Sequence, residues 1–197
     1  RRRRVAHRAE GDPLEQHGPH LNLATDYNLS EAYIQELLKF FPETARLNPL
    51  YIGSMRWGCG VGASVSLPET MLAGILNRYL DAIIAAGAKR ITVVSTHLAP
   101  NHLKVVGNLA QDRAGARIGM LTPFHYLKET EHDCHAGDVE TSLSLHLGLP
   151  VREEILGAIG NHGRTFSKPY VESISHLDMP EFTECVRGQC WNGIVGI

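Results

Sequence analysis

The stretch SLPETMLAGILNRYLDAIIAAGAKRITVVSTH, residues 66–97, carries the pattern that decides the fold. Apolar residues recur at helical spacing through its first part, which predicts a helix over residues 67–86 with one broad apolar face. Ser66 and Glu69 have the spacing of a capping box at the start of that helix. Residues 90–97 form a β-branched run without alternation, which is typical of a strand buried on both faces.

The alternation of helix and strand continues on both sides of this stretch. On its N-terminal side, residues 29–41 predict a helix capped by Ser30, and residues 49–55 predict a short strand. On its C-terminal side the pattern predicts a helix, a strand and a second helix, over residues 102–113, 117–122 and 138–147. Strands that alternate with helices imply right-handed crossovers, so we expect an α/β fold whose parallel sheet is covered by helices on both faces.

The composition is that of one globular domain. The chain has 197 residues, of which 43% are hydrophobic and 20% are charged. Its formal net charge of −2 gives no general attraction to nucleic acid or to an anionic membrane, and no apolar stretch reaches the ~20 residues that span a bilayer. We therefore expect neither a nucleic-acid partner nor a membrane. Four widely spaced cysteines and the absence of a secretory signal pattern favour a cytoplasmic protein with free thiols.

The first residues, 1–13, differ from the rest of the chain and are treated as an atypical basic segment. Arg1–Arg4 form a basic run, which we interpret as a solvated tail or a start outside the folded unit, with a nucleic-acid-binding arm as the alternative. Residues 11–13, Gly-Asp-Pro, oppose strand pairing. The domain itself is predicted over residues 14–197, and its apolar ending suggests an incomplete C-terminus.

The segment LEQHGPHLNLATDY, residues 14–27, concentrates carboxylates and imidazoles. Glu15 and His17 point to the same side of an extended backbone. A turn at Gly18 would fold the chain back and allow Asp26 to reach the same point. Mixed imidazole and carboxylate ligands suit zinc, manganese or iron. The segment is therefore either part of a metal site or a polar loop with a chance cluster of histidines.

Two distant stretches add donors of the same kind. His97 directly follows the predicted central strand, and α/β proteins bind ligands at that end of their strands. His135 and Glu140 lie at the start of the last predicted helix, whose dipole stabilises negative charge. His135 is interpreted as a proton carrier, although each histidine taken alone is more often an ordinary buried or surface residue. Five donors are expected to converge at one edge of the sheet: Glu15, His17, Asp26, His97 and Glu140.

Three segments together resemble the creatininase (creatinine amidohydrolase) family. EQHGPHLNLATD, residues 15–26, resembles the family signature E-x-H-G-x-H-L-P-L-G-T-D. HAGDVETS, residues 135–142, resembles the H-A-G-x-x-E-T-S motif of the family. The strand ITVVSTH, residues 91–97, takes the place of the family strand that ends in N-G-H-G-G-N. The resemblance runs from about residue 14 to the end of the chain.

The resemblance implies a three-layer α/β/α hydrolase with a mostly parallel central sheet and two adjacent divalent metal ions per chain. It also implies a homo-oligomer, in the family a homohexamer. The implied reaction cleaves a C–N bond of a small-molecule substrate, which can be a cyclic amide, a formamide or a small peptide. Zinc, manganese and iron are the metals that this set of ligands suits.

The resemblance also assigns roles by position. One ion would be held by Glu15, Asp26 and His97. The other would be held by His17 and Glu140, with Asp26 bridging the two ions. His135 would match the catalytic histidine of the family, and Glu140 would be a ligand, a general base or both.

Departures from the family pattern leave a second function open. THLAPN, residues 96–101, replaces a glycine-containing loop, and no apolar strand precedes Glu15, so the first strand is either missing or replaced by a non-native start. Arg56 and Trp57 stand where many members have a glutamate–histidine pair, and we interpret them as substrate contacts or as surface packing. The alternative function is that of a catalytically weakened homologue that binds metal and acts as an oligomeric scaffold.

Overall fold

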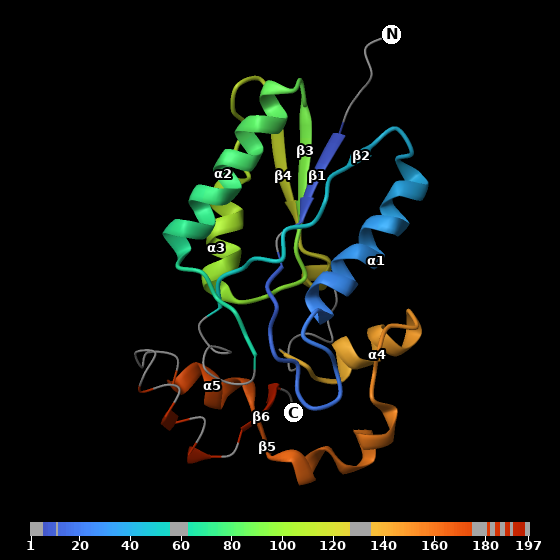
Figure 1. The fold of residues 1–197 in the computed structure, drawn as a ribbon, viewed down its shortest axis with the longest axis vertical. Coiled ribbons are helices and arrows are strands. Elements are labelled where there is room, and N and C mark those ends of the chain that lie inside the picture. The colour runs from blue at the N-terminus through green and yellow to red at the C-terminus, as the bar shows by residue number, and fades with distance from the viewer. Residues whose placement is uncertain are drawn as a thin grey trace.

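The computed structural model describes residues 6–10, 12–55, 63–126, 135–174, 181, 184–185, 188–189 and 191–195. Its centre is a four-stranded sheet in the order β2-β1-β3-β4, in which every pair of neighbours is parallel. The strands are β1 (Ala6–Glu10), β2 (Ala45–Arg46), β3 (Arg90–Val94) and β4 (Arg117–Leu121). The predicted parallel sheet is therefore confirmed (Figure 1).

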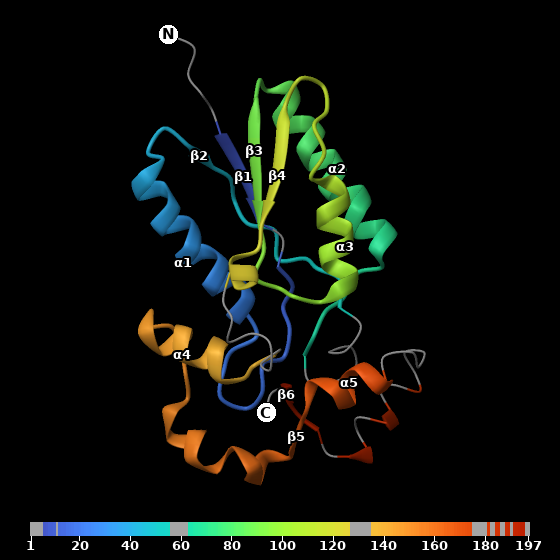
Figure 2. The ribbon, with the colours of Figure 1, turned by 180° about the vertical axis from the view of Figure 1, so that it is seen from behind.

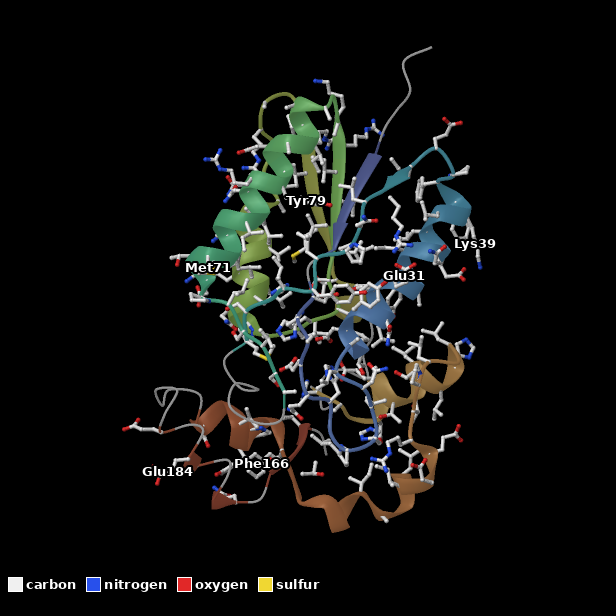
Figure 3. All side chains as sticks on the ribbon, in the orientation of Figure 1. Glu31, Lys39, Met71, Tyr79, Phe166 and Glu184 are labelled. Atoms are coloured by element: carbon white, nitrogen blue, oxygen red, sulfur yellow. The ribbon has the colours of Figure 1, made fainter. Side chains whose placement is uncertain are left out.

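Helices cover both faces of this sheet, as the sequence predicts. They are α1 (Thr25–Phe40), α2 (Glu69–Ala85) and α3 (Pro100–Leu109). Helix α1 lies on one face, and α2 and α3 lie together on the other (Figures 1 and 2). Leu76 and Leu80 of α2 belong to one buried cluster with Ile91 of β3, whereas Met71 is 53% exposed and points away from the sheet (Figure 3). The apolar stripe of α2 is therefore what fixes this helix to the sheet.

The remaining described helices and strands lie beyond the carboxyl ends of the strands of this sheet (Figure 2). They are η1 (Pro123–Tyr126), α4 (Asp138–His146), η3 (Glu153–His162), β5 (Arg164–Phe166), α5 (Lys168–Ile174) and β6 (Trp191–Val195). Strands β5 and β6 pair in parallel as a second, two-stranded sheet. None of the helices within the described residues has both the length and the hydrophobicity needed to cross a membrane.

The N-terminal strand corrects one expectation. The strand described as missing is present as β1, which pairs with β3 from Ala6↔Arg90 to Glu10↔Val94 and also pairs with β2. The turn-forming residues 11–13 come after the last paired residue, so they end the strand and do not prevent it. Residues 1–5, which include the basic run, lie outside the described residues.

Local signals for where elements begin are also corrected. Helix α1 begins at Thr25 and not at Ser30, whose buried hydroxyl instead donates to a carboxylate described below. The capping box at α2 is absent, because the Ser66 hydroxyl binds the backbone of Met55. The strand predicted over residues 49–55 is irregular apart from a bridge at residue 50. In each case a long-range contact replaces the local interaction that the sequence pattern favours.

Candidate metal centre

The candidate site lies where the strand order reverses. The chain passes from β1 through α1 to β2 on one side of β1, and then returns through α2 to β3 on the other side. The carboxyl ends of β1 and β3 therefore flank a topological switch point, the usual ligand position in open α/β sheets. The segment after β1 carries Glu15 and His17, and the segment after β3 carries His97.

The loop between Glu15 and Asp26 folds back, as predicted. The amide of Glu15 donates to the carbonyl of Leu23 at 3.0 Å, which closes the loop. Gly18 has a φ of +66°, a left-handed conformation that favours glycine. The loop thereby delivers Asp26 to the first turn of α1, directly beside the segment that carries Glu15 and His17.

A substitution at Gly18 tests the packing of this loop. A Cβ at Gly18 would lie 2.8 Å from Ile194 Cγ1 of β6 in addition to forcing the left-handed conformation. We expect Gly18→Ala to lower the free energy of unfolding of the metal-free protein by about 1–3 kcal/mol, measured by urea denaturation. The matched control is Gly74→Ala in α2, where a Cβ meets no atom within 4 Å, and it is expected to be neutral or stabilising. Equal losses in the two variants would contradict the role of Gly18.

All five predicted donors converge at this point, and all are buried. Their exposed fractions are 5% for Glu15, 1% for His17, 1% for Asp26, 3% for His97 and 7% for Glu140. They form two overlapping groups, Glu15–Asp26–His97 and His17–Asp26–Glu140, and in each group the possible ligand atoms lie within 4.8 Å of one another. The two groups share Asp26.

The distances show how Asp26 connects the two groups. Asp26 Oδ2 lies 3.1 Å from His97 Nδ1, and the same nitrogen lies 3.0 Å from Glu15 Oε2. Asp26 Oδ1 lies 3.4 Å from His17 Nε2, which lies 3.8 Å from Glu140 Oε2. One carboxylate thus turns one oxygen toward each group, which is the arrangement of a ligand that bridges two cations.

Backbone carbonyls fix the orientation of the histidine rings. The Nε2–H of His97 donates to the carbonyl of Ser54 at 3.3 Å, and the Nδ1–H of His17 donates to the carbonyl of Glu15 at 3.1 Å. A carbonyl only accepts, so these nitrogens carry the hydrogen, and the second nitrogen of each ring faces the carboxylates. Histidines that bind metals typically use the same arrangement, with one nitrogen on a backbone carbonyl and the other on the ion.

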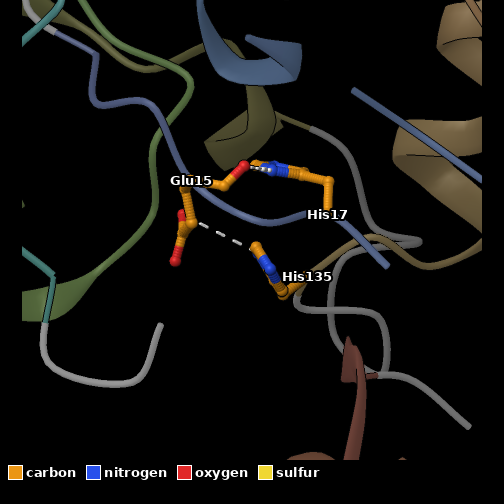
Figure 4. A group of neighbouring side chains, drawn as sticks. All are labelled: Glu15, His17 and His135. Atoms are coloured by element: carbon orange, nitrogen blue, oxygen red, sulfur yellow. Dashed lines mark hydrogen bonds and ion pairs between the residues drawn. The ribbon is translucent and has the colours of Figure 1, made fainter. Parts of the chain in front are cut away.

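His135 reaches the same centre from the segment before α4. Its Nδ1 lies 3.9 Å from Glu15 Oε2, and its ring centroid lies 4.4 Å from that of His17 (Figure 4). Its Nε2 lies 2.7 Å from the carbonyl of Gln16, which accepts its hydrogen, and 3.1 Å from the side-chain nitrogen of the same residue. Glu15, His17 and His135 form a third group whose ligand atoms lie within 4.8 Å of one another. Strand β6 holds the backbone of His135 through two hydrogen bonds with Val195, of 3.0 and 2.8 Å.

The charges of the centre balance only if cations or protons are present. Burial alone would lower the pKa of His17, but the carboxylates of Asp26 and Glu140 outweigh it and raise that pKa to about 10. Burial also opposes the charged form of His97, and the Glu15 and Asp26 carboxylates raise its pKa well above the usual value. Burial would raise the pKa of Asp26, but His17 and His97 hold it below its ordinary range. Without a metal, protons on these two imidazoles offset two of the three carboxylate charges, and divalent cations can take the place of the protons.

The donor set fits a divalent metal ion. Three of the converging atoms, Glu15 Oε2, His17 Nε2 and Asp26 Oδ2, are buried and make no hydrogen bond. Buried polar atoms without a hydrogen bond are unfavourable, because they have lost water and gained no hydrogen-bonding partner. Cations held by the two donor groups would satisfy all three atoms.

Some residues of the sequence analysis lie elsewhere. His20 is buried but bonds Thr141 Oγ1 through Nε2 at 2.8 Å and belongs to none of the donor groups. Arg56 and Trp57 lie outside the described residues, so their contact with substrate stays a prediction. The sequence analysis missed Asp12, which is 2% exposed beneath His97. No local signal could have indicated it, because the strand that precedes Asp12 is not recognisable from the sequence.

Comparisons with known proteins point to one family. The sequence model of the creatininase family, described as creatinine amidohydrolase, matches residues 13–164. A structure from Bacteroides fragilis, assigned as a creatinine amidohydrolase, has a TM-score of 0.69 and 18% identity over 96% of this chain and 86% of its own. The search of curated proteins found no match.

Two further structures carry metals in their descriptions. One described as "Creatininase Mn" has a TM-score of 0.58 and 20% identity, over 73% of this chain and 65% of its own. A mutant creatininase of "Zn-Zn type" has a TM-score of 0.58 and 18% identity, over the same shares of the two chains. The present chain thus spans just under two thirds of the length of these two structures. At such identities the likeness shows a common fold.

Proposed function

Because the chain belongs to the creatininase family, we propose that it is a dinuclear metal-dependent hydrolase that cleaves a C–N bond of a small molecule. Family membership and the buried donor groups support a metal-dependent amidohydrolase in general. One observation carries the dinuclear form of the proposal: Asp26 lies between two donor groups, with one oxygen toward His97 and the other toward His17.

The two donor groups define which residues would hold each ion. Glu15, Asp26 and His97 would hold the first, and His17, Asp26 and Glu140 the second. Imidazole and carboxylate ligands suit zinc, manganese or iron. When bound, two such ions lower the pKa of a water molecule and polarise the carbonyl of the substrate.

A hydrogen bond supports the proposal that Glu140 is a metal ligand. Its Oε2 accepts from the amide of Ala136, just before α4, and faces His17. This amide holds the carboxylate in one orientation, and the first turn of a helix stabilises its negative charge. We therefore assign Glu140 to the second ion and leave proton transfer to His135.

His135 is suited to carry the proton. Burial lowers its pKa, so the imidazole is neutral at neutral pH. Because Nε2–H donates to the Gln16 carbonyl, Nδ1 is the atom that exchanges protons. It accepts a proton at Nδ1 as the water oxygen bonds to the carbonyl carbon, and it delivers that proton to the leaving nitrogen as the C–N bond breaks.

The substrate class and the assembly follow from the resemblance. We propose a cyclic amide, a formamide or a small peptide as the substrate, and a homo-oligomer, in the family a hexamer, as the assembly. The departure of residues 96–101 from the family loop keeps the metal-binding scaffold as the second candidate.

Metal content is the measurement that tests this proposal. Elemental analysis of protein purified without chelators is expected to find close to two divalent ions per chain. The loaded protein should then hydrolyse at least one of the three substrate types, which generates a free amino group, and a chelator should abolish the reaction. No bound ion after supply of zinc, manganese and iron would overturn the proposal. Two ions without hydrolysis of any of these substrates would favour the scaffold.

A further inference from the structure

We infer that Asp12 is a positioning residue that holds His97 and Asp26 at the spacing that the first metal ion requires. This inference rests on the proposed function, because it concerns the geometry of the same donor group. Asp12 follows β1 and is 2% exposed, yet it is not among the residues whose atoms converge on the candidate ions. Its role must therefore come from the groups that it holds.

Each oxygen of the Asp12 carboxylate receives hydrogen bonds from the segment after β3. Oδ1 accepts from the Ser95 hydroxyl at 2.6 Å and from the His97 amide at 3.4 Å. Oδ2 accepts from the Ser30 hydroxyl and from the Thr96 amide, the latter at 3.5 Å. The amide that carries His97 is thus bonded directly to the segment that leads to Glu15.

The same network reaches Asp26 through α1. Ser30 lies one helical turn after Asp26, and its hydroxyl also accepts from the Thr96 amide at 3.1 Å. The Thr96 hydroxyl donates to the backbone carbonyl of Asp26 at 2.6 Å. Asp12 therefore connects the segment after β1, helix α1 and the segment after β3, which carry the three residues of the first donor group.

The choice of a carboxylate at this position argues for a role in the site. Removing an ion from water is unfavourable, and a buried charge is seldom the most stabilising choice for a core position. Asp12 receives only hydroxyl and amide donors in the bonds described, so its partners are neutral. Hydrogen bonds to an ionised acceptor are shorter and stronger than neutral ones, and they fix their donors more tightly. These hydrogen bonds therefore restrict the movement of His97 and Asp26, and the spacing of these two residues decides whether a cation fits.

Asp12→Asn in the full-length chain tests the inference. The amide keeps the shape but loses the charge and turns one acceptor into a donor that faces other donors. We expect the dissociation constant of one Mn²⁺ ion to rise about 10- to 100-fold, measured by competition with a chelator, while the second ion is bound nearly as before. The matched control is Asp81→Asn in α2, whose carboxylate is 58% exposed beside Arg113, and it should leave both constants unchanged. Unchanged Mn²⁺ binding in Asp12→Asn would overturn the inference.

A second readout separates this inference from the proposed function. In the metal-free protein, hydrogen exchange at the amides of Thr96 and His97 should become roughly tenfold faster or more in Asp12→Asn. If the wild-type chain binds no metal, the proposed function fails, and unchanged exchange at these amides would overturn the Asp12 inference as well. Should Asp12→Asn not fold, Ser95→Ala removes one donor and keeps the carboxylate. It should raise the same dissociation constant by a smaller factor, and an unchanged constant there would also contradict the inference.

Discussion

The Asp26→Ala protein is expected to bind neither metal ion, so that metal content falls from close to two ions per chain to close to zero. Asp26 is the one residue shared by the two predicted donor groups, and its oxygens lie 3.1 Å from His97 Nδ1 and 3.4 Å from His17 Nε2. Its removal takes one anionic ligand from each group, so each ion would lose both a ligand atom and a compensating negative charge. Elemental analysis after dialysis against metal-free buffer measures the result.

His17→Ala is the comparison that distinguishes a ligand shared by both ions from a ligand of one ion. His17 belongs to the group around the second ion, and His97 with Glu15 and Asp26 remains for the first. We expect this variant to keep about one ion per chain, with circular dichroism confirming that both variants are folded. Equal metal retention in Asp26→Ala and His17→Ala would refute the bridging position of Asp26.

The part of the fold that the sequence predicts well depends on long, periodic segments. Helix α2 and strand β3 are recognisable because a continuous apolar stripe and a β-branched run are buried by many neighbours at once. Strand β1 could not be recognised in this way, because it has five residues and follows a basic run. It is recognised only through its pairing with β3 and β2, which are distant in sequence.

The residues of the candidate site likewise separate into those that the sequence predicts and one that it does not. Glu15, His17 and Asp26 stand in one motif, and their convergence needs only a loop that closes on itself, which a turn at Gly18 predicts. Asp12 could not be identified, because its partners Ser30 and Ser95 are 18 and 83 residues away in the sequence. A residue that acts by connecting other elements carries no local pattern, so only the fold reveals it.

His135→Gln is expected to keep both metal ions and to lose turnover by about 10²- to 10⁴-fold on whichever amide the wild-type protein hydrolyses. The glutamine has no group that exchanges protons near neutral pH, whereas the two donor groups that share Asp26 remain complete without His135. Elemental analysis and the rate of amine release, measured on the same preparation, give the two quantities. The matched control is His20→Gln, because His20 is a buried histidine of the same region that bonds Thr141 and lies outside the donor groups.

The two readouts together decide what His135 does. Loss of turnover with full metal content assigns it to proton transfer, in keeping with Nδ1 as the nitrogen that is not bonded to the Gln16 carbonyl. Loss of one ion would instead make it a ligand, since Glu15, His17 and His135 also form a group of metal-binding geometry. Unchanged turnover would remove His135 from the mechanism. A similar loss in His20→Gln would show that the effect arises from disturbed packing of the loop, because His20 belongs to none of the donor groups.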